Sequence, residues 1–277
     1  MLPQPNDGFS WVQLPGGPAL VCRPLEPIAP HFYTTREWRL GTAPPDRRDE
    51  AWGDVARAAR VVAARLVRAR QVHGAQVIVS RRGETRPAGA DTAGEADIIV
   101  SDDPERALAI QTADCVPLLL ADRRTGVVAA AHAGWRGLAS GVPRIAVEAL
   151  AREFGSRPAD LVAAIGPSIG VCCYEVGADV RETFTAAGFE REIPEWIVDQ
   201  PQPTRQNPSM PARRAARRPQ HWFFNGWAAA YDQLVRAGVP LVDIHNAGLC
   251  TASHPSLCSF RRDAAASGRI AAVVRPR

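Results

Sequence analysis

Apolar residues recur along the chain at two spacings, one typical of helices and the other typical of strands. Between residues 50 and 70 they recur every three or four positions, as Val55, Ala58, Ala59, Val62 and Leu66 do, which predicts a helix. The same spacing predicts helices over residues 138–154, 175–187 and 223–237. Short runs rich in Ala, Val, Ile and Leu predict strands at residues 75–80, 96–101, 107–111, 116–121, 127–132, 161–165, 241–247 and 269–274.

The order of these elements favours an α+β fold with mixed sheets, because strands and helices alternate too irregularly for a doubly wound parallel sheet. Residues 1–30 are rich in proline and predict an irregular lead with one short strand at 19–22, so that the catalytic domain is expected over 31–277. The stretch 201–219 is rich in Pro and Arg, which indicates a flexible excursion or, alternatively, an anion-binding flap.

Composition places the chain among ordinary globular proteins and excludes several kinds of chemistry. Its 277 residues are 46% hydrophobic and 22% charged, and the net charge of +4 is too small to indicate nucleic-acid binding. All 33 basic residues are arginine, which excludes a lysine Schiff base, a P-loop lysine and a lysine general base. The N-terminus does not resemble a signal peptide, and no apolar run approaches the roughly 20 residues of a membrane span. The six cysteines include no C-x-x-C pair and are expected to be reduced, so we expect a cytoplasmic protein.

The strands predicted at 116–121 and 127–132 nominate a pair of metal ligands. If Ala121 pairs with Val127 or Gly126 across the intervening turn, Cys115 lies opposite Ala133 or His132. Side chains directly opposite each other have Cβ atoms roughly 4.5–5.5 Å apart, close enough for a thiolate and an imidazole to share one ion. The alternative is a buried thiol beside a core histidine.

A third ligand is needed for such a site, and the sequence offers more than one. His73 lies in Q-V-H-G, where Gly74 gives the backbone freedom to approach a site. Spacing alone does not rank His73 above His245.

Two further segments contain residue types that occur in binding sites. After His132 comes A-G-W-R-G-L, in which Arg136 and the start of a helix could bind an anion. The sequence equally fits a glycine turn with a solvated Arg136. The vicinal pair Cys172-Cys173 resembles neither a metal knuckle nor a redox motif, and a packing role is expected for it.

Several motifs, in order, resemble those of the laccase-domain family, whose members have been called polyphenol oxidases, peptidoglycan editing factors and multifunctional purine nucleoside phosphorylases. They are Q-V-H-G, T-A-D-C-V-P-L-L-L, H-A-G-W-R-G-L, I-G-P-S-I-G-x-C-C-Y-E-V-G and C-T-x(6)-C-S-F-R-R-D-x(4)-G-R-I-A. The resemblance runs from Tyr33 to Val274, nearly the whole chain.

The resemblance implies one α+β domain with mixed sheets flanked by helices, and zinc held by His73, Cys115 and His132. It also implies phosphorolysis of purine nucleosides (adenosine, inosine and methylthioadenosine), deamination of adenosine, or trimming of a wrong amino acid from a cell-wall precursor. Thr34-Thr35-Arg36 resembles the family's T-T-R element, which would bring Arg36 to the site. Two departures concern the substrate range: E-W-R-L-G-T-A-P-P follows T-T-R, and Phe224-Asn-Gly-Trp227 replaces an Asp-Leu-Trp-like run.

These observations predict a zinc-dependent purine nucleoside phosphorylase with adenosine deaminase activity. Three protein ligands leave one position open, as in catalytic zinc sites, and Cys115 is expected to be both ligand and catalytic residue. Phosphate would be held by Arg36 and Arg136, with Arg262 as a weaker third. Copper could occupy the same site, but six histidines without a His-X-His pair do not build a multicopper centre.

Two other functions stay open on the sequence. In a hydrolase that edits a peptidoglycan precursor, Cys115 would be the nucleophile and His132 the base. A non-enzymatic, zinc-stabilised binding module would require a fourth ligand such as His245. The sequence gives no indication of the oligomeric state.

Overall fold

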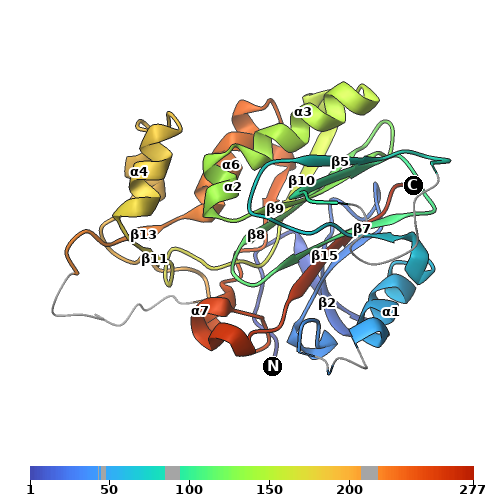
Figure 1. The fold of residues 1–277 in the computed structure, drawn as a ribbon, viewed down its shortest axis with the longest axis horizontal. Coiled ribbons are helices and arrows are strands. Elements are labelled where there is room, and N and C mark those ends of the chain that lie inside the picture. Colours follow the sequence, from blue (N-terminus) through green and yellow to red (C-terminus); the bar gives the residue numbers. More distant parts are fainter. Residues whose placement is uncertain (43, 45–47, 85–93, 207–217) are drawn as a thin grey trace.

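The computed structural model describes residues 1–42, 44, 48–84, 94–206 and 218–277 (Figure 1). Much of the predicted excursion at 201–219, namely residues 207–217, lies outside the described residues, so its character stays a prediction.

Two six-stranded sheets form the body of the protein. The first sheet consists, in spatial order, of β1 (Phe9–Leu14), β2 (Gly17–Cys22), β3 (His31–Thr34), β15 (Ile270–Val274), β7 (Ala107–Thr112) and β4 (Leu66–Val67). The second consists of β14 (Ile244–Asn246), β10 (Leu161–Ile165), β8 (Val116–Asp122), β9 (Val128–Ala133), β6 (Ile98–Ser101) and β5 (Val77–Ser80). Both sheets are mixed, because β4 and β7, β5 and β6, and β10 and β14 pair in parallel whereas the other pairs are antiparallel.

Helices lie outside the two sheets, and some of them cover the sheets' outer faces. They are α1 (Arg48–Ala58), α2 (Trp135–Ala139), α3 (Val142–Phe154), α4 (Ala178–Ala186), α5 (Ile193–Trp196), α6 (Gly226–Arg236) and α7 (Phe260–Asp263). Figure 1 shows the layers in the order α3 and α6, second sheet, first sheet, α1. The mixed sheets and flanking helices confirm the predicted α+β class.

The central strands are apolar at every position because both of their faces are covered. In β8, Leu118 and Leu120 pack under the helices, whereas Leu119 and Ala121 face the first sheet. This alternation follows from the two-residue period of a strand, and it explains why the sequence shows a continuous apolar run there.

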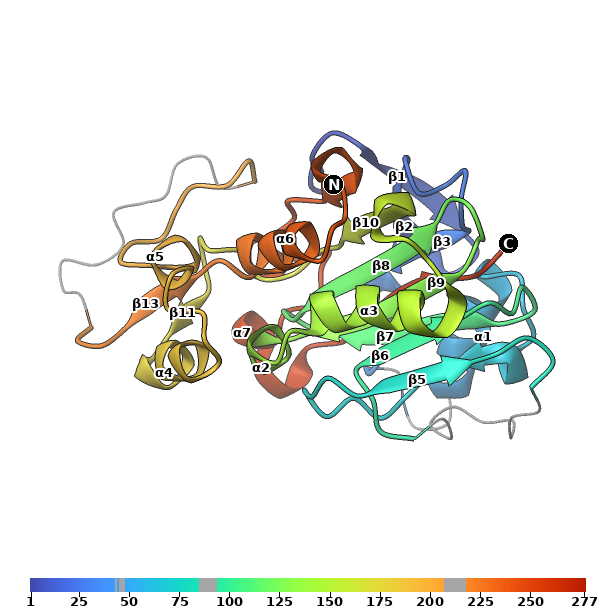
Figure 2. The ribbon, with the colours of Figure 1, turned by 90° about the horizontal axis from the view of Figure 1, so that it is seen from above.

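A small third sheet stands at one end of the molecule (Figure 2). Its strands are β11 (Glu175–Val176), β13 (Trp222–Phe224) and β12 (Ile197–Val198), and it packs with α4 and α5. The predicted helices at 175–187 and 223–237 each begin later than expected, because a short strand of this sheet comes first. Asn225 begins α6 by accepting a hydrogen bond from the N–H of Ala228 at 3.1 Å.

Two other helix predictions were wrong in extent. The helix predicted over 50–70 ends at Ala58, because Arg60 takes a left-handed conformation (φ 59°) and Leu66 then enters β4. The helix predicted over 138–154 is two helices, α2 and α3, since Gly141 at φ 82° breaks the run between them.

The lead expected over residues 1–30 is less irregular than predicted. The short strand expected at 19–22 lies in β2, but β1 pairs with it through a turn at Pro15-Gly16, and this hairpin forms one edge of the first sheet. Among the described residues, no helix combines the length and the apolar character that crossing a membrane requires.

Candidate metal centre

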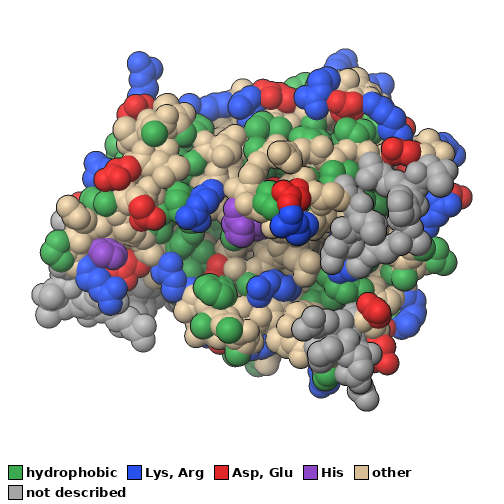
Figure 3. All heavy atoms as spheres, in the orientation of Figure 1, with side chains coloured by type: hydrophobic (Ala, Val, Ile, Leu, Met, Phe, Trp, Pro, Cys, Tyr) green, Lys and Arg blue, Asp and Glu red, His purple; other side chains and the backbone are tan. Residues whose placement is uncertain are grey.

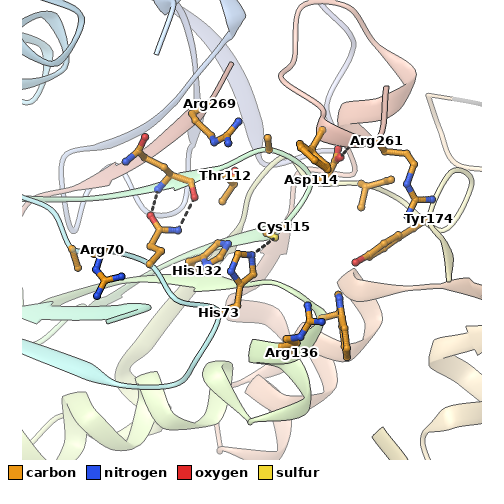
Figure 4. A pocket seen from close by; sticks show the side chains of 17 residues that line it. Arg70, His73, Thr112, Asp114, Cys115, His132, Arg136, Tyr174, Arg261 and Arg269 are labelled. Carbon is orange, nitrogen blue, oxygen red and sulfur yellow. Dashed lines mark hydrogen bonds between the residues drawn. The ribbon is translucent and has the colours of Figure 1, made fainter. Parts of the chain in front are cut away.

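A cavity of about 710 Å³ opens where β7, β8 and β9 end near helices α2 and α7. Histidine surface is visible near the middle of this face, with arginine side chains on both sides (Figure 3). The close-up in Figure 4 places His73, His132 and Cys115 together in the cavity, with Tyr174 and Arg261 toward one end and Arg70 toward the other.

Cys115 enters the site from the link between β7 and β8. The preceding residue, Asp114, has φ 85°, which turns the chain so that Cys115 lines the cavity. The Asp114 carboxylate accepts hydrogen bonds from the Thr251 hydroxyl and from the N–H of Arg261, both at 2.6 Å. A left-handed conformation of this kind at a non-glycine residue persists when neighbouring contacts fix it, as these two bonds do.

His132 comes from β9, one or two positions away from the two predicted registers. Asp122 extends β8 by donating its N–H to Val127, so that Pro117 pairs with His132 and Gly134 follows opposite Cys115. A Cβ atom at Gly134 would lie 3.0 Å from Cys115 Sγ and 3.0 Å from His73 Cδ2. The predicted pair of ligands therefore meets diagonally, across a position that only glycine leaves open.

His73 lies on a loop that the Gln71 side chain ties to the first sheet. The residue has φ 59°, and the Gln71 side chain next to it exchanges two hydrogen bonds of 2.7 Å with the backbone of Gln111 in β7. These bonds hold the loop against the first sheet, and the His73 side chain lies near His132 of the second sheet.

Asp97 orders two of the three site residues, and sequence reasoning missed it. This buried carboxylate accepts the N–H groups of Val72, His73 and Gly74 at 3.2, 3.1 and 2.7 Å, and it also accepts His132 Nδ1–H at 2.7 Å. The last bond turns His132 Nε2 toward the cavity, as the carboxylate–histidine arrangement of metal sites does. The available signal was a lone carboxylate directly before the apolar run Ile98-Ile99-Val100, where a buried charge needs partners.

The donor atoms of His73, Cys115 and His132 lie within 4.8 Å of one another, and His73 Nε2 is 3.8 Å from Cys115 Sγ. One sulfur and two imidazole nitrogens are donors that zinc binds at about 2.0–2.3 Å. Among the described residues no fourth histidine, cysteine or carboxylate joins this group, and His245 instead lies in β14 paired with Ala164. The residues present therefore fit a metal with an open position toward the cavity.

The charges of the site are coupled. Burial would raise the pKa of Cys115, but the charge and hydrogen bonds of His132 and His73 lower it to about 6. Burial would lower the pKa of His132, but the Cys115 thiolate and the Asp97 carboxylate raise it to about 9. Cys115 is consequently a thiolate at neutral pH, which is the form that binds metal or attacks as a nucleophile.

Of the arginines expected at the site, only Arg136 lines the cavity. Its guanidinium stacks over Trp135, with its central carbon 4.1 Å from the ring centroid. Arg36 and Arg262 are not among the described residues that line the cavity.

Arg36 and Arg262 have structural contacts instead. Arg262 donates to the carbonyl groups of Thr251, His254 and Leu257, which ties α7 to the loop before it. Arg36 forms an ion pair of 2.9 Å with Asp263 at the end of α7. Both side chains therefore hold α7, the helix that carries the lining residues Phe260 and Arg261.

The cavity also holds cations and aromatic rings that sequence reasoning did not select. Arg70, Arg261 and Arg269 line it in addition to Arg136. Tyr174, Trp135 and the exposed Phe260 supply ring faces. The arrangement suits a ligand that is both flat and anionic, or two ligands that together have these properties.

Comparison with known proteins agrees with this architecture. The family model described as multi-copper polyphenol oxidoreductase laccase matches residues 40–277. A protein of Deinococcus radiodurans named purine nucleoside phosphorylase is 33% identical over 272 residues, which covers 94% of this chain and 93% of that protein. A protein from an unknown prokaryotic organism named adenosine deaminase RL5 is 36% identical over 163 residues, which covers 58% of this chain and 55% of that protein.

Among solved structures, YlmD from Geobacillus stearothermophilus superposes with a TM-score of 0.78 at 27% identity, covering 98% of this chain and all of that one. Together with the family model, which matches most of the chain, these similarities confirm the resemblance seen in the motifs. The chain belongs to the multi-copper polyphenol oxidoreductase laccase family.

Proposed function

We propose that the protein is a zinc-dependent purine nucleoside phosphorylase acting on adenosine, inosine and methylthioadenosine. The observation that carries the proposal is the His73, Cys115 and His132 group in a cavity lined by arginines and aromatic rings. The name of the Deinococcus radiodurans relative, purine nucleoside phosphorylase, supports the same activity. At about 710 Å³ the cavity lies in the range of small-molecule sites, roughly 300–1,000 Å³.

Zinc is the metal that the donor set favours. A thiolate and two imidazoles with one open position match catalytic zinc sites, and a zinc ion bound there supplies Lewis-acid chemistry. Copper binds such donors more tightly in solution, so copper bound in vitro would not identify the working metal. The six histidines of the chain include no His-X-His pair, so the family's title does not imply a multicopper centre here.

The chain's own residues would divide the work between the two parts of the substrate pair. The faces of Tyr174, Trp135 and Phe260 offer stacking surfaces for the flat purine. Arg136 offers a guanidinium for phosphate. A phosphate oxygen then forms a bond to C1′ of the ribose while the bond from C1′ to the purine nitrogen breaks, and the base leaves with the electron pair and takes up a proton.

The proposal is tested by the phosphate requirement. With inosine, ribose 1-phosphate should form in phosphate buffer, and with methylthioadenosine the corresponding 5-methylthioribose 1-phosphate. Both products should disappear in a phosphate-free buffer of equal ionic strength. Adenosine deamination, the activity named for one relative, consumes water and should persist without phosphate. Free ribose formed at an equal rate without phosphate would contradict the phosphorylase proposal.

A second function is favoured by one observation, the chain of contacts from Asp97 to His132 to Cys115. Asp97 orients His132, and His132 lowers the pKa of Cys115, which is the pattern of a cysteine nucleophile with its base. Such an enzyme would cleave an amide in a peptidoglycan precursor and would need no metal. Activity that survives complete removal of metal would favour this hydrolase.

We infer a cytoplasmic location for the enzyme. Purine nucleosides are intracellular metabolites, and the six cysteines form no disulfide among the described residues. A fractionation of cells that express the chain would test the inference.

A further inference from the structure

A second group of sulfur atoms lies behind the cavity, outside the site described above. Cys172, Cys173 and Cys250 place their Sγ atoms within 4.8 Å of one another, and the Sγ atoms of Cys172 and Cys173 are 3.6 Å apart. Three sulfurs arranged around one ion at about 2.3 Å would be separated by about 4 Å. The spacing therefore suits a single metal ion in the plane of three sulfurs.

The backbone around these residues brings the sulfurs together. The N–H groups of Cys173 and Tyr174 both donate to the carbonyl of Gly170, so that the chain turns at Cys172 and Cys173. In an extended chain, neighbouring side chains would point in opposite directions, whereas this turn draws the two sulfurs toward each other. Cys250 arrives from a segment that bridges to Ser168, far away in sequence.

The three sulfurs have polar neighbours and are not packed against apolar side chains alone. The N–H of Gly170 donates to Cys250 Sγ at 3.3 Å, and the Ser253 hydroxyl lies 3.4 Å from Cys173 Sγ and 3.7 Å from Cys172 Sγ. Hydrogen bonds to sulfur are a usual feature of metal-bound thiolates, because they spread the negative charge. The Arg261 guanidinium donates to the carbonyl of Glu175 at 2.9 Å beside the group, which adds a positive charge.

We propose that Cys172, Cys173 and Cys250 form a binding site for Cu(I), in which three sulfurs hold the ion. Among the described residues, no histidine or carboxylate joins this group, so the donors are soft and number three. Zinc in structural sites takes four ligands, whereas Cu(I) is selected by soft sulfur donors. On binding, S–H bonds are replaced by Cu–S bonds and the protons leave to solvent, with no change in oxidation state.

The site differs from the candidate zinc centre in its donors and in its access. Cys172 and Cys250 are buried and Cys173 is half-buried, and none of the three is among the residues that line the cavity, whereas Cys115 is. The assignment does not depend on the proposed phosphorylase activity.

The experiment uses the Cys115→Ser chain, in which the candidate zinc centre lacks its sulfur. Cu(I) is supplied without oxygen in the presence of the chelator bathocuproine disulfonate, and bound copper is measured after desalting. About one copper per chain is expected, with X-ray absorption showing three sulfur neighbours. Adding Cys250→Ser, or the less buried Cys173→Ser, should abolish binding.

The matched control is Cys258→Ser in the same background. Cys258 is as deeply buried as Cys250, at 1% against 0% exposed, but lies outside both donor groups, so this change should leave the copper in place. Copper retained by both Cys250→Ser and Cys173→Ser, or equal loss in Cys258→Ser, would overturn the proposal. So would a parent chain that loses all copper to the chelator or fills the site with zinc alone.

Discussion

Cys115 and the group of Cys172, Cys173 and Cys250 lie in opposite chemical surroundings. Cys115 lies beside two imidazoles, whose charge and hydrogen bonds lower its pKa to about 6 although burial acts the other way. In the second group, hydrogen bonding with Cys172, together with the surrounding sulfurs and burial, raises the pKa of Cys250, and Cys172 raises the pKa of Cys173 as well. The comparison shows that the neighbours of a thiol, more than its burial, decide whether it is a thiolate at neutral pH.

The groups that contact the ligands from outside also differ between the two sites. Behind Cys115 stands a buried carboxylate, Asp97, which compensates a positive charge on His132. Beside Cys172 and Cys173 lie neutral hydroxyl groups, that of Ser253 and, for Cys172, that of Thr204 at 4.0 Å. A mixed sulfur and nitrogen site can therefore accept a divalent ion, whereas the sulfur group should select a soft monovalent one.

The largest effect should follow removal of the thiolate. We expect Cys115→Ser to lose both the metal and the activity, with kcat/KM falling about 10³-fold, because several kcal/mol of charge stabilisation depend on the ion. Elemental analysis and nucleoside assays on the same preparation check this. A variant that keeps its metal but is inactive would show that Cys115 is a nucleophile and not a ligand.

The next effect concerns pH in the metal-free protein. A thiol with a pKa near 6 is mostly thiolate at pH 7, whereas one at 9.0 is about 1% ionised, so the thiolate fraction of Cys115 should be about 100-fold that of an ordinary thiol. Cys115 should therefore react faster with iodoacetamide at pH 7, by less than this ratio because a thiolate of lower pKa is a weaker nucleophile. Because the pKa is lowered, this reactivity should persist as the pH falls and should halve near pH 6. Peptide mass spectrometry gives the rates.

Cys173 and Cys250 provide the comparison within the same digest. Their pKa values are raised, so their labelling should become appreciable only above pH 9. Equal labelling of Cys115 and Cys173 at pH 7 would remove the contrast between the two groups. Added zinc should protect Cys115 alone.

Asp97→Asn should have a smaller effect that separates orientation from ligation. The amide cannot accept all the hydrogen bonds that the carboxylate accepts, so His73 and His132 lose their fixed directions. Loss of an outer partner of this kind lowers metal affinity about 10–100-fold, which a competition titration with a zinc chelator measures.

The matched change is Asp103→Asn. Asp103 is also a buried carboxylate, paired with Arg106 at 3.0 Å, but its side chain holds Glu105 and Arg106 and not the residues of the metal centre. It should lower stability and leave the zinc affinity unchanged. If both variants lose zinc equally, Asp97 acts through stability and has no particular role at the metal.

Much of the fold could be predicted from the sequence, because the apolar pattern of the buried strands is strong. The strand expected at 161–165 is β10, Leu161–Ile165, and five apolar residues in a row left little choice. Helix ends were less predictable where a single backbone conformation decides them, as at Arg60 and Gly141. Both registers predicted for the β8–β9 hairpin were wrong, by one and by two residues, because Asp122 stays in the strand and its carboxylate accepts a hydrogen bond from the N–H of Arg124 in the turn.

The candidate site was only partly predictable, and for a different reason. Cys115 and His132 belong to one hairpin, so the pairing of β8 with β9 brings them close even though the observed register differs from the predicted ones. Asp97 lies directly before β6, 35 residues from His132 along the chain, and the spacing of the hairpin gives no sign of it. Whether an arginine reaches the site depends on the direction of its side chain, which the sequence does not give. The T-T-R element predicted Arg36 at the site, but its side chain forms an ion pair with Asp263.

The smallest effect should come from the arginines beside the two groups. Arg136 is exposed and stacks on Trp135, so its guanidinium can reach an anion in the cavity, whereas Arg261 is engaged with the carbonyl of Glu175. We expect Arg136→Ala to raise the KM for phosphate about 10-fold, equivalent to about 1.4 kcal/mol, with bound zinc unchanged. Arg261→Ala should change it less, because its carbonyl contacts hold the turn at Cys173 and Tyr174 and do not face phosphate. Initial rates over a phosphate series at fixed inosine measure both constants, and the reverse order would assign the anion to the Arg261 side of the cavity, next to the sulfur group.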